Sequence, residues 1–384
     1  MLNRCRLLLV FLFFLFFATG SNGICKAQNN LRLDLLLDAG LIYDSNFYFD
    51  PVDEIGVTTF LVQPGVEIGY ETSKTEWAAR YQLNANYYDR AEEDDFYGHA
   101  AFLQGDIEIT ERLSFELSDN FRYTRDPANL DPLGNVAVRE KYYQNRAKAL
   151  FSYYFEPRFT VEAGYQNWIT DYKDDLLEDA VGHQGIFDLI YHLNRTASLA
   201  LEYNYWAMDY SESTPDYTSN QLSLVARMEW MHAGLEAGVG YQNRSFDAPG
   251  LDDIEVVPYF LKLETASSSG KTRFTLSAEH NFNYLNLSSQ GYYKADRFGF
   301  TLDYDLTERI TAGLGGYYQK SDYEDSPRED DTYNITGDIK YLIKEWLVFH
   351  VAAGYETRDS TIPSREYDNW MAMGQLQFVY SIDR

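Results

Sequence analysis

Histidines are the residues that would most readily indicate a catalytic or metal site, and in this chain they are scattered. The 384 residues contain six of them, at His99, His183, His192, His232, His280 and His350. No two have the spacing expected of metal ligands on one element. The sequence also lacks the Gly-x-Ser-x-Gly, His-Glu-x-x-His and Gly-rich phosphate-loop motifs. We therefore expect no catalytic residue, no metal site and no cofactor, and an enzyme is the least supported class of function.

Acidic side chains offer a second kind of chemistry, because carboxylate oxygens bind divalent cations. They form runs such as Glu92–Asp95, Asp252-Asp253 and Glu329–Asp331, in segments that we expect to be loops. A chain with 59 Asp and Glu residues produces such runs by chance, and most are solvated loop tips. A sharper hypothesis is that they hold divalent cations against the phosphates of lipopolysaccharide.

The N-terminus has the three-part layout of a secretory signal peptide. Arg4 and Arg6 provide a basic start, Leu7–Ala18 form an apolar run, and small residues precede a cleavage point after Ala27. A membrane-spanning helix needs about 20 apolar residues, so this run is too short to be an anchor. We expect two segments, a signal peptide at 1–27 and a single domain at 28–384.

The composition indicates an exported protein without disulfides. Both cysteines, Cys5 and Cys25, fall within the expected signal peptide, so the mature chain has no thiol. The net charge of −27 argues against nucleic acid as a partner. With 33 Tyr and 24 Phe, a negative mean hydropathy and no long apolar run after residue 27, the chain is typical of β-barrel membrane proteins.

The dominant pattern is an alternation of apolar and polar residues with period two. In the segment 76–88, Trp77, Tyr81 and Leu83 occupy one set of alternating positions, and Arg80 and Gln82 lie in the other. Successive side chains of a strand point to opposite faces, so each such strand has one lipid face and one watery face. About eighteen segments follow the pattern, each long enough to cross a membrane, which takes about 9–11 tilted residues. They are 32–43, 58–71, 75–89, 97–110, 112–125, 140–155, 158–171, 182–193, 195–209, 218–231, 233–245, 255–266, 271–286, 292–305, 308–321, 331–343, 346–358 and 366–382.

The connections between these segments alternate between short turns and long loops, which is the arrangement of outer-membrane barrels. An even strand number places both termini and the short turns in the periplasm, and the long loops outside the cell. In lipid every backbone N–H and C=O must be paired, so the first strand is expected to pair with the last. Aromatic residues also flank the apolar segments, as in interfacial girdles. A soluble propeller is disfavoured because no blade repeat is present. The expected fold is all-β, a closed antiparallel transmembrane β-barrel of about eighteen strands.

The same alternation predicts which side chains line the lumen. The candidates are Arg80, Tyr88, Arg122, Arg146, Trp168, Glu202, Trp206, Arg227, Glu229, Lys262, Arg273 and Glu279. Opposite charges on neighbouring strands can simply cross-brace the wall. Both signs are present, with a small acidic excess, whereas a pore for a polyanion should have a basic lining. The inward aromatic rings of Tyr88, Trp168 and Trp206 could stack on sugar rings, or they could plug the lumen.

One stretch near the start resembles a known family. The residues Tyr43, Asp44, Ser45 and Asn46 at the end of the first strand, followed by Pro64-Gly65 in the second, are similar to outer-membrane β-barrel porins associated with exopolysaccharide gene clusters. The same tetrapeptide is also a good turn. The resemblance implies a single-domain barrel that passes an exopolysaccharide, with a periplasmic polysaccharide-export protein as its partner. It transfers no catalytic residue.

These observations lead to a ranked set of functional hypotheses. The first is an outer-membrane pore of a Gram-negative bacterium that exports a neutral or weakly charged exopolysaccharide. The alternatives are a general diffusion porin and a non-conducting structural or adhesive barrel. Expected partners are outer-membrane lipid and lipopolysaccharide, the polysaccharide cargo and the export protein, but not nucleic acid.

Overall fold

The computed structural model describes residues 30–90, 95–125, 141–173, 178–211, 215–248, 252–284, 292–323 and 327–383. The expected signal peptide at 1–27 therefore lies outside the described residues, as does most of the long loop between 125 and 141. Among the described residues, no helix is both long enough and apolar enough to cross a membrane.

Strands account for nearly all of the regular structure, as the period-two pattern predicts. The first half of the chain contains β1 (Leu31–Asp44), β2 (Val57–Glu71), β3 (Thr75–Tyr88), β4 (Phe96–Thr110), β5 (Leu113–Thr124), β6 (Tyr142–Glu156), β7 (Phe159–Tyr172), β8 (Ala180–His192) and β9 (Ala197–Tyr210). The second half contains β10 (Tyr217–Trp230), β11 (Ala233–Phe246), β12 (Ile254–Val256), β13 (Tyr259–Ala266), β14 (Thr272–Tyr284), β15 (Tyr292–Thr307), β16 (Ile310–Tyr323), β17 (Glu329–Lys344), β18 (Leu347–Ser360), the short 3₁₀ helix η3 (Pro363–Arg365) and β19 (Tyr367–Asp383).

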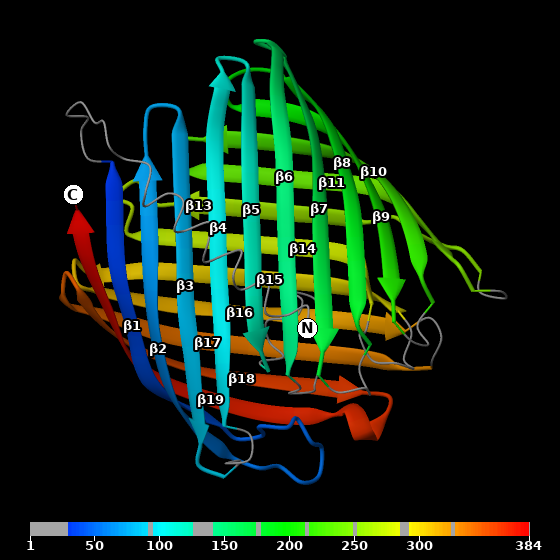
Figure 1. The fold of residues 1–384 in the computed structure, drawn as a ribbon. Helices are drawn as coiled ribbons and strands as arrows, with labels where there is room; N and C mark the ends of the chain where they lie inside the picture. The colour runs from blue at the N-terminus through cyan, green and yellow to red at the C-terminus, as the bar shows by residue number, and fades with distance from the viewer. Residues whose placement is uncertain are drawn as a thin grey trace, which may run out of the picture.

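All strand pairs are antiparallel, and the sheet closes on itself. The closing pair joins β1 to β19 in an unbroken register from Arg32 opposite Asp383 to Asp44 opposite Met371 (Figure 1). Closure pairs the outer edges of β1 and β19 with each other, as a barrel in lipid requires. The expectation that the first strand pairs with the last is confirmed.

The expected strand 255–266 is interrupted. Both β12 and β13 pair with β11, so together they make one crossing, and the barrel has 18 crossings. The break falls at Val257-Pro258, because proline has no backbone N–H to donate to the ladder. The predicted count of about eighteen strands is confirmed.

The two ends of the barrel differ in their connections. At one end, the turn end, neighbouring strands are joined by short turns such as 72–74 and 111–112. At the other, the loop end, the connections are longer, as in 45–56 between β1 and β2. This alternation of short and long connections is the outer-membrane arrangement.

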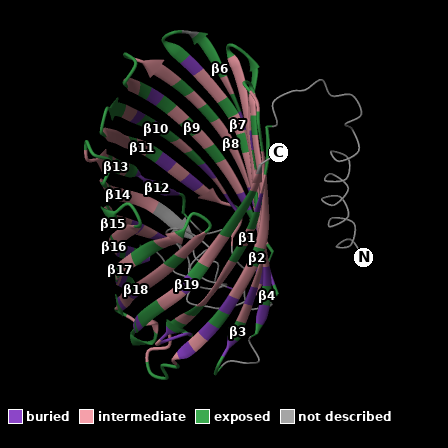
Figure 2. Cartoon of the chain, turned by 90° about the vertical axis from the view of Figure 1, so that its left-hand side faces the viewer, coloured by how far each residue is buried: buried purple, intermediate pink, exposed green. Residues whose placement is uncertain are grey.

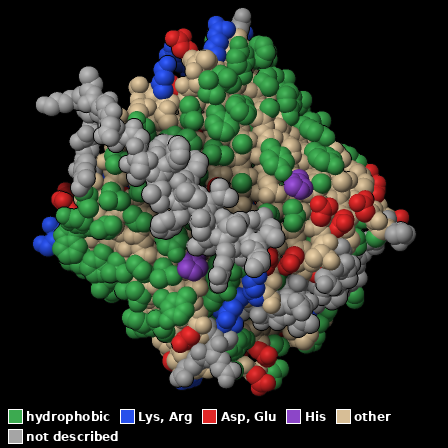
Figure 3. Space-filling model, in the orientation of Figure 1, with side chains coloured by type: hydrophobic (Ala, Val, Ile, Leu, Met, Phe, Trp, Pro, Cys, Tyr) green, Lys and Arg blue, Asp and Glu red, His purple; other side chains and the backbone are tan. Residues whose placement is uncertain are grey.

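The outer wall is apolar. Leu35, Leu201, Leu224 and Ile335 point outward and are exposed, and exposure alternates along the strands (Figure 2). Large hydrophobic side chains cover much of the wall seen in Figure 3. Exposed outward aromatic residues lie near both strand ends, which are the positions of the two interfacial girdles. They include Tyr43, Tyr87, Tyr97, Tyr241, Tyr259 and Trp370 toward the loop end, and Tyr70, Tyr153, Phe159, Trp230, Tyr304 and Tyr341 toward the turn end.

Candidate functional site

The inner face of the barrel is the candidate site. Residues directly opposite each other on paired strands share a face, so the register extends the inward assignment from strand to strand. Arg80 lies opposite Glu67, Arg146 opposite Trp168, and Glu202 opposite Asp188. The register places the twelve expected lumen residues on one and the same face of the sheet, which we propose lines the lumen: Arg80, Tyr88, Arg122, Arg146, Trp168, Glu202, Trp206, Arg227, Glu229, Lys262, Arg273 and Glu279.

Ion pairs brace neighbouring strands in the turn half of this wall. Glu67 of β2 accepts hydrogen bonds from Arg32 of β1 and Arg80 of β3, each at 2.6 Å. Arg227 of β10 bridges Glu202 of β9 and Glu236 of β11, with 2.8 Å to Glu236. Because these side chains are partly exposed, each pair contributes only about 0–1 kcal/mol. Their main effect is to fix the position of charge along the lumen.

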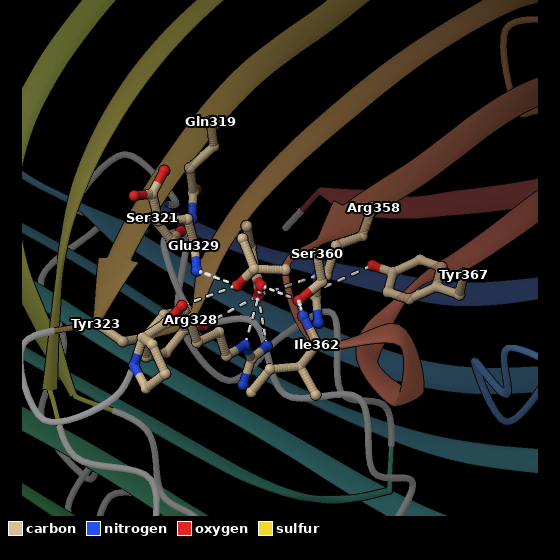
Figure 4. A network of polar contacts seen from close by, with 12 residues as sticks. Gln319, Ser321, Tyr323, Arg328, Glu329, Arg358, Ser360, Ile362 and Tyr367 are labelled. Carbon is tan, nitrogen blue, oxygen red and sulfur yellow. Dashed lines mark hydrogen bonds and ion pairs between the residues drawn. The ribbon is translucent and has the colours of Figure 1, made fainter.

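A buried polar network occupies the loop half of the wall on β16 to β19. Asp330 is fully buried and accepts hydrogen bonds from Arg328 at 2.9 Å, Ser360 at 2.7 Å and Tyr323 at 3.2 Å. Figure 4 shows Tyr323, Arg328 and Ser360 directed toward one another. The hydrogen bonds and the guanidinium group together compensate the cost of burying the carboxylate.

The location of Asp330 corrects one expectation from the sequence. The run Glu329–Asp331 was expected in a loop, but it forms the first residues of β17. Asp330 points inward into the network, and Asp331 points outward, where it accepts a hydrogen bond from Tyr318 at 2.6 Å. Hydrogen bonds from Tyr323 of β16 and Ser360 of β18 to Asp330 hold the start of β17 in place, although its acidic composition is typical of a solvated loop.

Four arginines of the loop half stack on tyrosine rings. The distances from guanidinium carbon to ring centroid are 3.8 Å for Arg297 and Tyr317, and 4.2 Å for Arg328 and Tyr323. The other two pairs are Arg244 with Tyr217 at 4.0 Å and Arg358 with Tyr367 at 4.8 Å. Such stacking is favourable by about 0.5–2 kcal/mol. It holds the cations flat against the wall.

The residues of the family-like motif join the first strand to the last. Asn369 of β19 donates from Nδ2 to Asp44 at 3.2 Å, and its Oδ1 accepts from the backbone N–H of Asn46 at 3.0 Å. Ser45 accepts from the backbone N–H of Trp370 at 2.7 Å. Tyr43 points outward and is exposed. The motif thus sits at the seam where the barrel closes.

The loop 45–56 that follows the motif folds inward. Phe47 is 1% exposed and packs in a cluster with Val57, Tyr88 and Phe96, whose side chains all lie on the inner face. The loop is tied to itself, since Asn46 donates to the Asp50 carbonyl at 2.8 Å and accepts from the Asp50 N–H at 2.9 Å. Backbone N–H groups of Asp53 and Val52 hold the pKa of Asp50 below its usual value.

This loop changes the interpretation of Tyr88. The sequence predicts that its ring lies on the lumen face, where it could stack on a sugar or plug the lumen. The ring is on that face, but it is buried, with Phe47 at a centroid distance of 5.1 Å. Trp168 is also partly covered, packing against a cluster that includes Met208. Sequence alternation could not show this covering, because it comes from a loop and from neighbouring strands.

The Pro64-Gly65 pair lies in β2. Pro64 faces outward opposite Leu37, and the β2–β3 ladder has a gap at this proline. Gly65 faces inward, and a Cβ there would lie 2.9 Å from the Tyr81 carbonyl oxygen. The strands therefore approach too closely for another residue without a shift, which gives a physical reason for glycine at this position.

The histidines are not gathered at one site. His99 and His183 point outward. His99 is hydrogen-bonded to the Tyr81 hydroxyl at 2.7 Å, and His183 to the Tyr165 hydroxyl at 2.5 Å. His280 contacts Asp296 at 2.8 Å, also on the outer face. Within the described ranges, no three His, Cys, Asp or Glu side chains form a group that could hold a metal ion.

Comparisons with known proteins identify the same architecture. Residues 233–378 match a family described as "Putative beta-barrel porin 2". The structure is similar to Pseudomonas aeruginosa OpdK with vanillate, at a TM-score of 0.51 and 11% identity, covering 92% of this chain and 99% of that one. It is also similar to P. aeruginosa OccK2 (OpdF), at a TM-score of 0.53 and 10% identity. A third similar structure is Acinetobacter baumannii OccAB4, at a TM-score of 0.52 and 9% identity. Each of these two matches covers 92% of this chain and 99% of the other. No curated protein matches the chain.

The class of fold follows from these findings. The chain is a closed antiparallel β-barrel of the outer-membrane porin type. At about 10% identity the neighbours show the fold alone, and the family match covers less than half of the chain.

Proposed function

We propose that this protein is a channel of the bacterial outer membrane that passes a hydrophilic solute through its lumen. The observation that carries the proposal is the contrast between the two faces of one closed sheet. The outside has exposed leucines between two aromatic belts, and the inside is lined by ion pairs. An apolar exterior with a polar, hydrated interior is the physical requirement for a transmembrane channel. The aromatic belts would contact lipid and, toward the loop end, lipopolysaccharide.

The finer proposal is that the cargo is an exopolysaccharide of neutral or weak charge. Two features support it. The motif at Tyr43–Asn46 resembles porins of exopolysaccharide gene clusters, and the lumen mixes both signs of charge rather than presenting a basic lining. A periplasmic polysaccharide-export protein would deliver the polymer to the turn end, and residues 1–27 would direct the chain to the secretory pathway.

The neighbours suggest a different cargo, which we weigh against this one. OpdK is known in a structure with vanillate and OccK2 (OpdF) in complex with glucuronate, and both ligands are carboxylates. The inner wall of the present chain carries several carboxylates without an ion-pair partner, which disfavours anions. We therefore do not extend those ligands to this protein.

Deletion of the gene in its host tests the cargo. The expected result is loss of surface polysaccharide while polymer synthesis continues and polymer accumulates in the periplasm, with recovery on complementation. A matched pair of variants separates the lumen from the wall. Gly234 faces the lumen and Gly374 faces lipid, and a Cβ at either meets nothing within 4 Å. Gly234→Trp should slow export, and Gly374→Trp should not.

The outcomes distinguish the alternatives. Normal surface polysaccharide in the deletion strain, combined with reduced uptake of small solutes, would favour a general diffusion porin. Normal polysaccharide and normal uptake, with loss of surface attachment, would indicate a structural or adhesive barrel. Either result overturns export while leaving the fold intact.

A further inference from the structure

Positive and negative charges are distributed differently along the inner wall. In the turn half and the middle of the barrel, lysines and arginines of the inner face are held in ion pairs. Arg32 contacts Glu67 at 2.6 Å, Lys148 contacts Glu116 at 3.4 Å, and Lys262 contacts Glu264 at 2.8 Å. Arg80, Arg227, Arg273 and Lys340 are likewise paired. Each such cation is therefore balanced by at least one carboxylate.

Further carboxylates on the same wall have no such balance. Within the described residues, Asp38, Glu76, Asp106, Glu108, Glu162 and Asp188 form no ion pair, and the register turns all of them inward. Asp38 and Asp106 contact only glutamine amides, at 3.3 and 3.1 Å. The unbalanced charge of the turn half is therefore negative.

Two of these unbalanced carboxylates lie in one row with the paired carboxylate Glu202, across three adjacent strands. Glu162 of β7 is directly opposite Asp188 of β8, which is directly opposite Glu202 of β9. Like charges opposite each other are destabilising, so the row is not explained by wall stability. Glu202 forms an ion pair with Arg227. Glu162 accepts a hydrogen bond from the Ser152 hydroxyl at 2.9 Å. Asp188 keeps a carboxylate oxygen without a hydrogen-bond partner.

Three arginines of the loop half add little to this balance for a passing solute, whereas Arg122, which donates to Gln144 at 2.8 Å, and Arg146 are partly exposed cations above the turn half. Arg244, Arg328 and Arg358 are each 5% exposed or less, and each lies against a tyrosine ring. Arg328 and Arg358 also share Asp330, at contacts of 2.9 and 4.0 Å. Their charge is covered and partly neutralised, whereas the turn-half carboxylates border the lumen.

We infer that the lumen is cation-selective, with its selectivity set by the unpaired carboxylates of the turn half. Fixed charge of one sign on a pore wall raises the local concentration of the opposite ion and excludes ions of its own sign. The inference rests on the proposed channel function and specifies its substrate class. Neutral or cationic solutes pass, and polyanions are repelled at the turn end, where an exported polymer would enter.

Reversal potentials in planar bilayers test this inference, with the refolded mature barrel in a KCl gradient. At about 0.1 M salt, where the screening length is about 10 Å, K⁺ should permeate several times better than Cl⁻. At about 1 M, with a screening length of about 3 Å, the preference should largely disappear. The double variant Glu162→Gln/Asp188→Asn removes two of these unpaired carboxylates and should move the permeability ratio toward 1.

Asp209→Asn is the matched control. Asp209 lies on β9 like Glu202, but it faces outward and is exposed. Asp209→Asn therefore removes one negative charge, as each lumen substitution does, but it leaves the charge of the lumen wall unchanged. Its permeability ratio should equal that of the wild type. A wild-type channel that conducts but prefers Cl⁻ or neither ion overturns the inference and leaves the channel function standing. An equal loss of selectivity in Asp209→Asn would also overturn it. Absence of any conductance would instead contradict the proposed function.

Discussion

Asn369 on the last strand holds Asn46 at the start of the first loop, through a hydrogen bond of 3.0 Å from the Asn46 backbone N–H to the Asn369 side-chain oxygen. The two residues are 323 positions apart in the sequence. The same side chain also donates to Asp44 at 3.2 Å, and both asparagines are buried. The Asn369 side-chain amide therefore links the last strand both to the end of β1 and to the first residues of the inward loop.

Asn369→Ala should weaken the loop end of this seam. It removes the side-chain acceptor of the buried Asn46 N–H and one hydrogen-bond donor to the Asp44 carboxylate, and losing the acceptor of a buried N–H costs about 1–3 kcal/mol. The measurement is the temperature at which the folded barrel loses its compact migration on gels. Asn120→Ala is the control, because Asn120 is exposed on the inner face of β5. Equal midpoints for both variants would contradict the role of Asn369.

Phe47→Ala should release the first loop from the inner wall. The ring is almost completely buried against Val57, Tyr88 and Phe96, and removing such a ring typically costs about 3–5 kcal/mol. We expect higher single-channel conductance and protease cleavage within 45–56. Phe60→Ala is the matched control, since Phe60 is exposed on the outer face of β2. An unchanged conductance and cleavage pattern in Phe47→Ala would show that the loop is not held by this contact.

Asp330→Asn should destabilise the loop half of β16 to β18. The substitution leaves Arg328 and Arg358 buried without their carboxylate, and breaking a buried ion pair costs about 3–5 kcal/mol. Denaturant unfolding of the refolded barrel measures the loss. Asp359→Asn removes an exposed, outward carboxylate from β18 and should cost less than about 0.5 kcal/mol. Similar losses for the two variants would argue against the network.

Leu276→Arg and Thr275→Arg test the assignment of the two faces. Leu276 is exposed on the outer wall, and its neighbour Thr275 lies on the inner one. Arginine facing lipid near the bilayer midplane costs about 2–4 kcal/mol, whereas an arginine in the lumen remains hydrated. Leu276→Arg should therefore fold poorly in lipid vesicles and Thr275→Arg should fold well. The opposite order would invert the assignment.

Much of the architecture was predictable because a strand has an exact period of two. The segment 76–88 shows this, since alternation alone gave both its extent and the inward position of Arg80, which the register of β3 reproduces. The break at Pro258 was not predicted, although the missing N–H of proline was visible in the sequence. Pro258 lies inside the alternating segment 255–266, and the alternation continues in the same phase on both sides of it.

The loop-end contacts could not be predicted from the sequence. Phe47 reaches Tyr88 across 40 residues, and Asn46 reaches Asn369 across most of the chain, so neither contact has a local signal. Asp330 was expected in solvent because acidic runs usually lie there, but Tyr323 and Ser360 become its partners only when β16, β17 and β18 are side by side. Alternation assigns a face, and it carries no information about what covers that face.

Single-channel recording of the refolded barrel in a planar lipid bilayer shows whether the lumen is a conducting path. We expect steady conductance that increases in Phe47→Ala and decreases in Gly234→Trp, with Gly374→Trp at the wild-type value. A barrel that inserts with the correct heat-dependent gel migration but carries no current, in the wild type and in Phe47→Ala alike, would contradict this expectation.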